Sequence, residues 1–353
     1  WQEIWATGRE ETDAAGLNPI TKYDYQWKEV TGTRKGRYCF TENGAVRFEY
    51  LPVGTYILKE SVTPSGYATA EPVLFEITDT GHLELIHQVV MKDEPLRLKI
   101  SKNIITGGKE VAGASMGIYP VDENGEVSKT PLVLHIPEEN GCYRDEKAVW
   151  ISGMDGAYTQ EEMEKGEIPH GLEPGDLKPH QIEYIPVGSY ILKEETTPYG
   201  FLQSVDIPFT IKDTKEIQKL EMQDEIPQGR LEVIKHDSED QEMLLQGAEF
   251  ELFNKTLGIS CGKQETDQHG KAGFLAQPIG YMDKNGNFCP YDYLVRETKA
   301  ASGYMLSEKI MEFQFEYKDE KTPLIKLTYD PINDSNRVQI KKLLGDTQEY
   351  LEG

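Results

Sequence analysis

An internal repeat constrains this chain more than any other feature of its sequence. Residues 51–67 read LPVGTYILKESVTPSGY and residues 185–201 read IPVGSYILKEETTPYGF, so 11 of 17 positions are identical at an offset of 134 residues. A weaker third copy, YDYLVRETKAASGY, occupies residues 291–304. Self-similarity of this kind indicates a chain built from repeated structural units. The copies place three glutamates at one equivalent position: Glu60, Glu194 and Glu297.

A basic strand accompanies the repeat in a constant order. It reads LRLKISK at 96–102, RLEVIK at 230–235 and RVQIKK at 337–342, and a step of small residues such as Val-Ala-Gly-Ala follows each copy. The repeat therefore predicts the following division of the chain: modules at 1–95, 96–227 and 228–336, and the start of a further, truncated repeat at 337–353.

Short runs of alternating polar and apolar residues predict an almost wholly β structure. Runs such as TYILKE, AEFELF and FQFEY lie between Asn-Gly turns, a pattern typical of β-hairpins. Regular short strands with Gly and Pro punctuation indicate β-sandwiches in series, and the short linkers at 93–95 and 225–229 favour a stiff array. The second module carries an insertion at about 130–180, in which residues 159–165 predict one short helix.

Strand alternation sends charged side chains into the predicted cores. Successive residues of a strand face opposite sides, so Lys102 and Lys235 share a face with the apolar residues of their strands. By the same count, Asp93 and Asp224 follow apolar residues on the inward face of the strand before each basic strand. Because burying a lone charge is costly, each inward charge needs a partner or must become neutral.

The ordered elements carry a resemblance to a known family. A lysine strand, a Gly-Ala step, a Gly-x-Tyr-x-Leu-x-Glu box and a terminal strand ending in Asp or Asn resemble the collagen-adhesin B-type modules of Gram-positive surface adhesins and pilins. The resemblance covers nearly the whole chain. It implies an all-β fold of tandem transthyretin-like (prealbumin-like) or immunoglobulin-like β-sandwich modules in an elongated array. It also implies a spontaneous isopeptide bond from the lysine to the Asp or Asn, promoted by the glutamate.

In the second module, this resemblance assigns Lys102 as the nucleophile, Glu194 as the promoting residue and Asp224 as the acceptor. Glu195 competes with Glu194, but alternation from the preceding strand residues favours Glu194. The alternative interpretation is a buried, salt-bridged triad that never reacts.

In the third module, Lys235 and Glu297 take the same roles, and two residues compete as the acceptor. Alternation along the terminal strand leads to Asn333. Asn333 precedes the lysine of the next basic strand, Lys342, by nine residues, and Asp93 precedes Lys102 by the same number. Asp330 aligns with the second module's acceptor when residues are counted from the preceding strand, but it faces the other side. We favour Asn333.

The first module departs from the pattern. Glu60 and Asp93 are in place, but no basic strand with a Gly-Ala step precedes them, and Lys22, Lys28 and Lys35 lie in unsuitable contexts. Either the missing strand lies upstream of the first residue or this module has no crosslink, so we expect no bond there.

Composition excludes several classes of function. With 37 basic and 61 acidic residues the formal net charge is −24, which disfavours binding to nucleic acid or anionic lipid. No run approaches the roughly 20 apolar residues of a membrane span, and no spacing of His or Cys predicts a metal site or cofactor. Cys261 and Cys289 either pair within one module or remain isolated thiols.

These observations predict a structural protein rather than an enzyme. We expect an extracellular stalk or pilin-like adhesin attached to a cell wall, with its anchor outside this sequence. Its expected partners are other pilus subunits, or a protein or glycan on a host surface. Two alternatives stay open: a ligand-binding adhesin that uses the insertion at 130–180 as its contact surface, and the spacer region of a cell-envelope enzyme.

Overall fold

The computed structural model confirms the predicted all-β architecture. It describes the backbone of residues 2–3, 6–12 and 19–25, and the complete residues 53–79, 88–105, 107, 110–138, 142–153, 177–284 and 286–341. The regular secondary structure of these residues consists of strands, with no helix among them. The predicted helix at 159–165 lies outside the described residues.

The first group of strands forms small sheets. Its members are β1 (Gln2–Glu3), β2 (Ala6–Thr12), β3 (Pro19–Tyr25), β4 (Gly54–Leu58), β5 (Tyr67–Ala68), β6 (Val73–Ile77) and β7 (Glu94–Pro95). Strand β4 pairs antiparallel with β6 and parallel with β1, while β2 pairs with β3 and β5 with β7. Tyr56 of β4 is buried and stacks on Phe75 of β6, with 5.5 Å between ring centroids. The first copy of the repeat therefore forms a strand with an inward tyrosine.

The second group forms two sheets that face each other. Its members are β8 (Arg97–Ile104), β9 (Ser115–Val121), β10 (Val133–Pro137), β11 (Tyr143–Lys147), β12 (Val149–Ile151), β13 (His180–Glu183), β14 (Gly188–Thr196), β15 (Ile207–Ile211) and β16 (Gln218–Asp224). One sheet has the order β12-β9-β14-β15 and the other β13-β8-β16. Strands β10 and β11 form a separate hairpin within the predicted insertion.

The third group repeats this plan. Its members are β17 (Gln228–Ile234), β18 (His236–Asp237), β19 (Glu249–Asn254), β20 (Ile259–Glu265), β21 (Lys271–Gly273), β22 (Gln277–Pro278), β23 (Gly280–Met282), β24 (Phe288–Pro290), β25 (Tyr293–Lys299), β26 (Ile310–Phe313), β27 (Leu324–Tyr329) and β28 (Ile332–Asn333). One sheet has the order β20-β19-β25-β26, and in the other β17 pairs with β21, β22 and β27.

In both sandwiches the first strand lies beside the last and runs parallel to it. Strand β8 pairs with β16 in a register that places Lys102 opposite Met222 and Ile104 opposite Asp224. Strand β17 pairs with β27, and the parallel pairing resumes in β18 and β28, where Asp237 lies opposite Asn333. The two ends of each sandwich are therefore neighbours in space.

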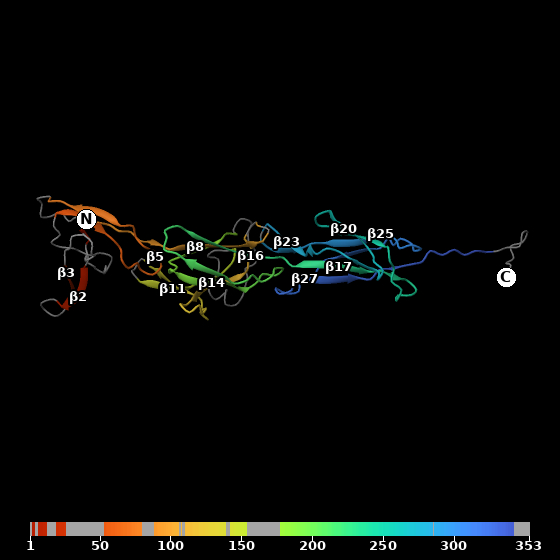
Figure 1. Cartoon of the computed structure of the whole chain (residues 1–353), viewed down its shortest axis with the longest axis horizontal. Helices are drawn as coiled ribbons and strands as arrows, with labels where there is room; N and C mark the ends of the chain where they lie inside the picture. Colours follow the sequence, from red (N-terminus) through yellow and green to blue (C-terminus); the bar gives the residue numbers. More distant parts are fainter. Residues whose placement is uncertain are drawn as a thin grey trace, which may run out of the picture.

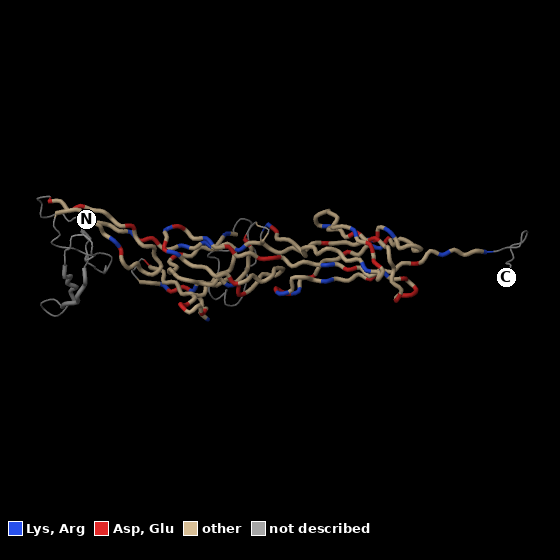
Figure 2. Tube along the Cα trace, viewed as in Figure 1, with Lys and Arg blue, Asp and Glu red and all other residues tan. Residues whose placement is uncertain are grey.

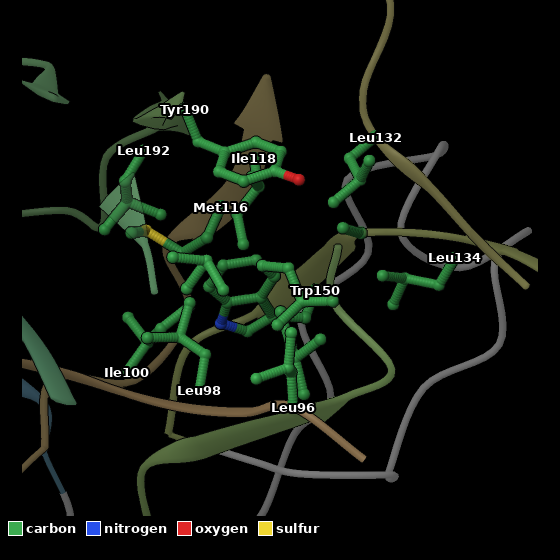
Figure 3. Packing of buried hydrophobic residues seen from close by; sticks show 14 of the residues in the cluster. Leu96, Leu98, Ile100, Met116, Ile118, Leu132, Leu134, Trp150, Tyr190 and Leu192 are labelled. Carbon is green, nitrogen blue, oxygen red and sulfur yellow. The ribbon is translucent and has the colours of Figure 1, made fainter. Parts of the chain in front are cut away.

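Each sandwich buries its own apolar core. Figure 3 shows the core of the second group, where Leu98 and Ile100 from one sheet approach Met116 and Trp150 from the other. Full burial of an aliphatic side chain stabilises a fold by about 1.5–3 kcal/mol. The third group has a separate buried cluster built from β17, β19 and β25. In the sequence, the buried residues of the first cluster end before the predicted linker at 225–229 and those of the second begin after it. The exact limits of the modules remain a prediction.

The sandwiches follow one another along the long axis of an elongated molecule (Figure 1). At the junction between the second and third groups, Tyr317 Oη donates to Phe201 O at 2.9 Å and its ring lies 4.8 Å from that of Tyr199. Gly200 has a φ of +95°, and a Cβ at this position would lie 2.1 Å from Cγ of Phe288. Only glycine suits this backbone and this close approach, so the junction is closely packed.

Asp and Glu residues, red in Figure 2, occur along the whole length of the described chain. No helix in the described part is long and apolar enough to cross a membrane. Cys261 and Cys289 do not form a disulfide with each other, and Cys39 lies outside the described residues.

Candidate functional site

Each of the three repeated glutamates is held by an equivalent backbone hydrogen bond. Oxygen Oε2 of each accepts a hydrogen bond from the backbone N–H ten residues later in the chain. The pairs are Ala70 with Glu60 at 2.8 Å, Ser204 with Glu194 at 2.7 Å and Ser307 with Glu297 at 2.9 Å. The repeat thus fixes the position of each carboxylate as well as its place in the sequence.

In the second sandwich the structure brings Lys102, Glu194 and Asp224 together. Nζ of Lys102 lies 2.9 Å from Oε1 of Glu194 and contacts Oδ1 of Asp224. All three residues are buried. The parallel register explains the contact, because Asp224 lies two residues beyond the residue opposite Lys102 and so on the same face of the sheet.

The electrostatics of this trio reflect its dry surroundings. Burial raises the pKa of Glu194 and of Asp224, and the nearby charge of Lys102 opposes both shifts. Oδ2 of Asp224 has no hydrogen-bond partner among the described residues. Two carboxyls with raised proton affinity therefore lie beside one amine in a dry site.

In the third sandwich the structure brings Lys235, Glu297 and Asn333 together. Nζ of Lys235 donates to Oδ1 of Asn333 at 2.6 Å and lies 3.7 Å from Oε1 of Glu297. The amide Nδ2 of Asn333 donates to both carboxylate oxygens of Glu297, at 2.9 and 3.0 Å. All three residues are buried. The carboxylate therefore touches the acceptor's amide nitrogen, while the amine faces the amide oxygen.

Burial also alters the lysine of this trio. It lowers the pKa of Lys235 to about 8, and the charge of Glu297 opposes this shift. The ammonium lies 5.6 Å from the centroid of the Phe250 ring, within cation–π range. A substantial fraction of Lys235 is consequently a neutral amine near pH 8, and a neutral amine is the nucleophilic form.

Two other candidates lie elsewhere. Asp330, the alternative acceptor, is exposed, as its position in the alternation predicts. Asp93 is exposed as well, so the expectation that it faces the core is wrong. Residues 88–93 lie in no strand, and without strand pairing no alternation is imposed on them. Glu60 is half-buried and accepts from Thr63 and Ala70, so the structure does not assemble Glu60 and Asp93 into a trio.

Sequence reasoning missed two residues next to Lys102. Glu110 is buried and accepts from the backbone N–H of Lys102 at 2.8 Å and from the Ser101 hydroxyl; burial raises its pKa. Ser204 contacts both Lys102 and Asp224 through its hydroxyl. The ten-residue spacing to the anchoring N–H, with a serine at the end of it in both the second and the third copy (Ser204 and Ser307), could have located Ser204; no repeated side chain marks Glu110.

The described residues contain no cluster of three or more His, Cys, Asp or Glu residues arranged to hold a metal ion. The chemistry open to each trio is therefore that of its own groups. An amine, a carboxyl or amide carbon and a proton-carrying carboxylate lie within contact distance in a buried site.

Tandem β-sandwiches with parallel first and last strands and a buried lysine between them define a pilin-type surface-protein fold. A sequence profile of the SpaA prealbumin-like fold domain matches residues 10–90 and 229–330, more than half of the chain. The chain belongs to this family. The profile leaves out residues 91–228, although the strands there repeat the order of the third sandwich.

Solved structures with a similar arrangement include three proteins of Gram-positive bacteria. The Bacillus anthracis TIE protein is 22% identical over 94% of this chain and 49% of its own, with a TM-score of 0.44. A streptococcal ancillary pilin is 17% identical (81% and 76% covered, TM-score 0.26), and the major pilin SpaD of Corynebacterium diphtheriae 12% identical (68% and 97%, TM-score 0.25). The chain spans about half the length of the first of these. No curated protein sequence matches it.

Proposed function

We propose that this chain is a structural segment of a bacterial surface protein, a stalk or pilin-like adhesin, locked by two autocatalytic isopeptide bonds. The bonds join Lys102 to Asp224 and Lys235 to Asn333. The observation that carries the proposal is the direct contact of each buried lysine Nζ with an acceptor side chain on the neighbouring terminal strand. The family of SpaA prealbumin-like domains is consistent with this role.

The reaction in the third sandwich releases ammonia. The neutral amine of Lys235 attacks Cγ of Asn333, and a proton passes by way of Glu297 to the amide nitrogen. Loss of that nitrogen as ammonia leaves a neutral amide bond. The two hydrogen bonds from Nδ2 to Glu297 support this route, since the leaving group already touches the proton carrier. Proximity supplies much of the acceleration, as in other intramolecular reactions.

The reaction in the second sandwich releases water. Lys102 attacks Cγ of Asp224, Glu194 relays a proton, and the carboxyl hydroxyl leaves as water. Each product is uncharged, so the cost of keeping ions in a dry core disappears. Each trio reacts once and has no external substrate, and for this reason we regard the chain as a structural protein and not an enzyme.

Such bonds suit a protein under tension outside the cell. Because each bond joins the first and last strands of a sandwich, a pulling force passes through covalent linkage and does not unravel the sheets. We accordingly propose an extracellular, cell-wall-attached location, with other pilus subunits or a host protein or glycan as partners. The ligand-binding alternative stays a prediction, since residues 139–141 and 154–176 of the insertion lie outside the described residues.

The intact mass of the purified chain tests this proposal. We expect it to be lower than the sequence mass by one water and one ammonia, because each bond expels one small molecule. Peptide mapping after proteolysis should recover two branched peptides, one containing Lys102 and Asp224 and the other Lys235 and Asn333. An unmodified mass with linear peptides would reject both bonds.

The rate of closure in the third sandwich should rise with pH. Burial lowers the pKa of Lys235 to about 8, so the nucleophilic amine is the minor form below that pH. When unreacted chain is refolded from urea, ammonia loss should accelerate about tenfold per pH unit below pH 7 and level off above about pH 8. Peptide mass spectrometry of acid-quenched samples measures the rate, and near-ultraviolet circular dichroism controls for folding. A rate that falls as the pH rises would contradict this assignment.

A further inference from the structure

We propose that Ser204 is a catalytic residue of bond formation in the second sandwich, where its hydroxyl stabilises the oxyanion that forms on Oδ1 of Asp224. This inference rests on the proposed function and adds to it a hydroxyl whose contact with the acceptor occurs in the second sandwich and not in the third.

The contacts of Ser204 place it against both reacting groups. Its Oγ donates to Oδ1 of Asp224 at 2.6 Å and accepts from Nζ of Lys102 at 3.1 Å. Its backbone N–H holds Glu194. One residue therefore contacts the nucleophile, the acceptor and the proton carrier.

The third sandwich shows why the second one needs this hydroxyl. There the acceptor is an amide, and Glu297 binds its leaving nitrogen directly. In the second sandwich the facing carboxylate, Glu194, contacts the lysine instead. Ser307, the counterpart of Ser204, keeps the backbone bond to Glu297, while its hydroxyl accepts from the backbone of Lys309. The hydroxyl contact is thus specific to the sandwich with an aspartate acceptor.

The step balances as follows. In the neutral pair, the Lys102 amine attacks Cγ of protonated Asp224, the new N–C bond forms, and the electron pair of the C=O π bond moves to Oδ1. The Ser204 proton stays on its oxygen and hydrogen-bonds to this oxyanion. Nζ then gives a proton to Glu194, and Oδ2 leaves with its own proton and one from Glu194. The products are one amide and one water molecule.

The hydroxyl contributes more in the transition state than before it. Ser204 has one proton and two acceptors, Oδ1 of Asp224 and the backbone oxygen of Gln223 at 2.7 Å. Hydrogen bonds to a charged oxygen are stronger than those to a neutral one, so the proton turns toward Oδ1 as charge develops there. An interaction that strengthens only during the reaction is one that accelerates it.

The test compares closure rates of two bonds in one chain. Unfolded, unreacted wild-type, Ser204→Ala, Ser204→Thr and Ser307→Ala chains are refolded from urea. Branched peptides in acid-quenched samples report each bond. In all chains Trp1, Trp5 and Trp27 are replaced by phenylalanine, so that fluorescence reports folding through Trp150, which is buried in the second core. We expect Ser204→Ala to slow closure of the Lys102–Asp224 bond about 100-fold after folding is complete, as loss of one oxyanion donor does. Ser204→Thr keeps a hydroxyl and should retain most of the rate.

The other bond is the internal control. Closure of Lys235–Asn333 should be unchanged in Ser204→Ala, and Ser307→Ala should leave both rates unchanged. Equal closure of Lys102–Asp224 in wild type and Ser204→Ala would overturn this inference alone. If Ser204→Ala only delayed folding, with closure keeping pace with Trp150 burial, the serine would be structural and the inference also overturned. If the wild-type chain never formed the Lys102–Asp224 bond, the proposed function of that sandwich would fail together with the inference.

Discussion

Replacing Glu297 with glutamine should leave the third sandwich open and lower its stability by roughly 4–5 kcal/mol. The glutamine side chain retains the shape of the glutamate and one acceptor oxygen for Nδ2 of Asn333, but it cannot relay the proton that ammonia loss requires. The open bond spans 98 residues, and the analogy with disulfide loop closure gives the stated magnitude. The readouts are the mass, which should exceed the wild-type value by one ammonia, and guanidinium unfolding.

Two matched variants make this result specific. Glu194→Gln should give the reciprocal outcome, with the water retained and the ammonia lost. Glu60→Gln alters the equivalent position in the first module, where the structure assembles no trio, and should keep the losses of one water and one ammonia. The chain unfolds in several units, so each transition needs its own probe; Trp150 fluorescence reports the second sandwich, and hydrogen exchange of peptides from β19 and β25 reports the third. Ammonia loss at the wild-type rate in Glu297→Gln would contradict the role of this glutamate.

The sequence predicted the positions of both trios because each depends on strand periodicity. Lys102 lies in β8 and Lys235 directly follows β17. Burial alternates along both strands up to the lysine, so burial of the neighbouring apolar residues sends each lysine inward. The same count separated Asn333 from Asp330, which lie on opposite faces. Their roles in forming a bond remain predictions, since geometry alone does not form a bond.

Other features depend on tertiary contacts that no local pattern encodes. Asp93 follows the same apolar alternation as Asp224, but residues 88–93 pair with no strand and Asp93 is exposed. Glu110 supports Lys102 in a way the repeat does not share: the N–H of Lys235 donates to the backbone oxygen of Gly270, whereas the N–H of Lys102 donates to this side chain. Strand β13 pairs with β8 from Arg97 to Ile100, and beyond this pairing the buried carboxylate of Glu110 accepts the hydrogen bond from the N–H of Lys102.

The largest destabilisation is expected for Lys102→Ala. The substitution removes the nucleophile, so the Lys102–Asp224 bond and its roughly 4–5 kcal/mol of loop-closure stabilisation are lost. It also leaves two carboxyls, Glu194 and Asp224, buried without the amine where the closed site holds an uncharged amide, and a buried charge without its partner costs about 3–5 kcal/mol. Lys99→Ala is the matched control, because Lys99 lies on the same strand and is exposed. It should keep both mass losses and nearly wild-type stability.

The pH dependence of Lys102→Ala separates these two costs. Burial raises the pKa of Glu194 and Asp224 in the fold, and loss of the Lys102 charge raises both further. When the pKa of a carboxyl is higher in the folded chain than in the unfolded chain, where it is about 4, the carboxyl contributes its full stabilisation at a pH below about 4. This stability is lost as the pH rises through the folded-state pKa, since the folded chain must then release a proton in a dry site. The melting temperature of the second sandwich should therefore fall as the pH rises above about 4.

A double variant identifies the carboxyls as the cause of that slope. In the wild-type chain the bond consumes Asp224, so only Glu194 of the pair can titrate and the slope should be shallower. The double variant Lys102→Met with Asp224→Asn forms no bond and keeps Glu194 as the titrating carboxyl of the pair. It should combine the lowered stability of the open sandwich with the shallow dependence of the melting temperature on pH. Thermal unfolding followed by Trp150 fluorescence at several pH values measures both quantities. A flat profile for Lys102→Ala would mean that the two carboxyls reach water in the fold, and a site wetted in this way could not hold the neutral amine that bond formation requires.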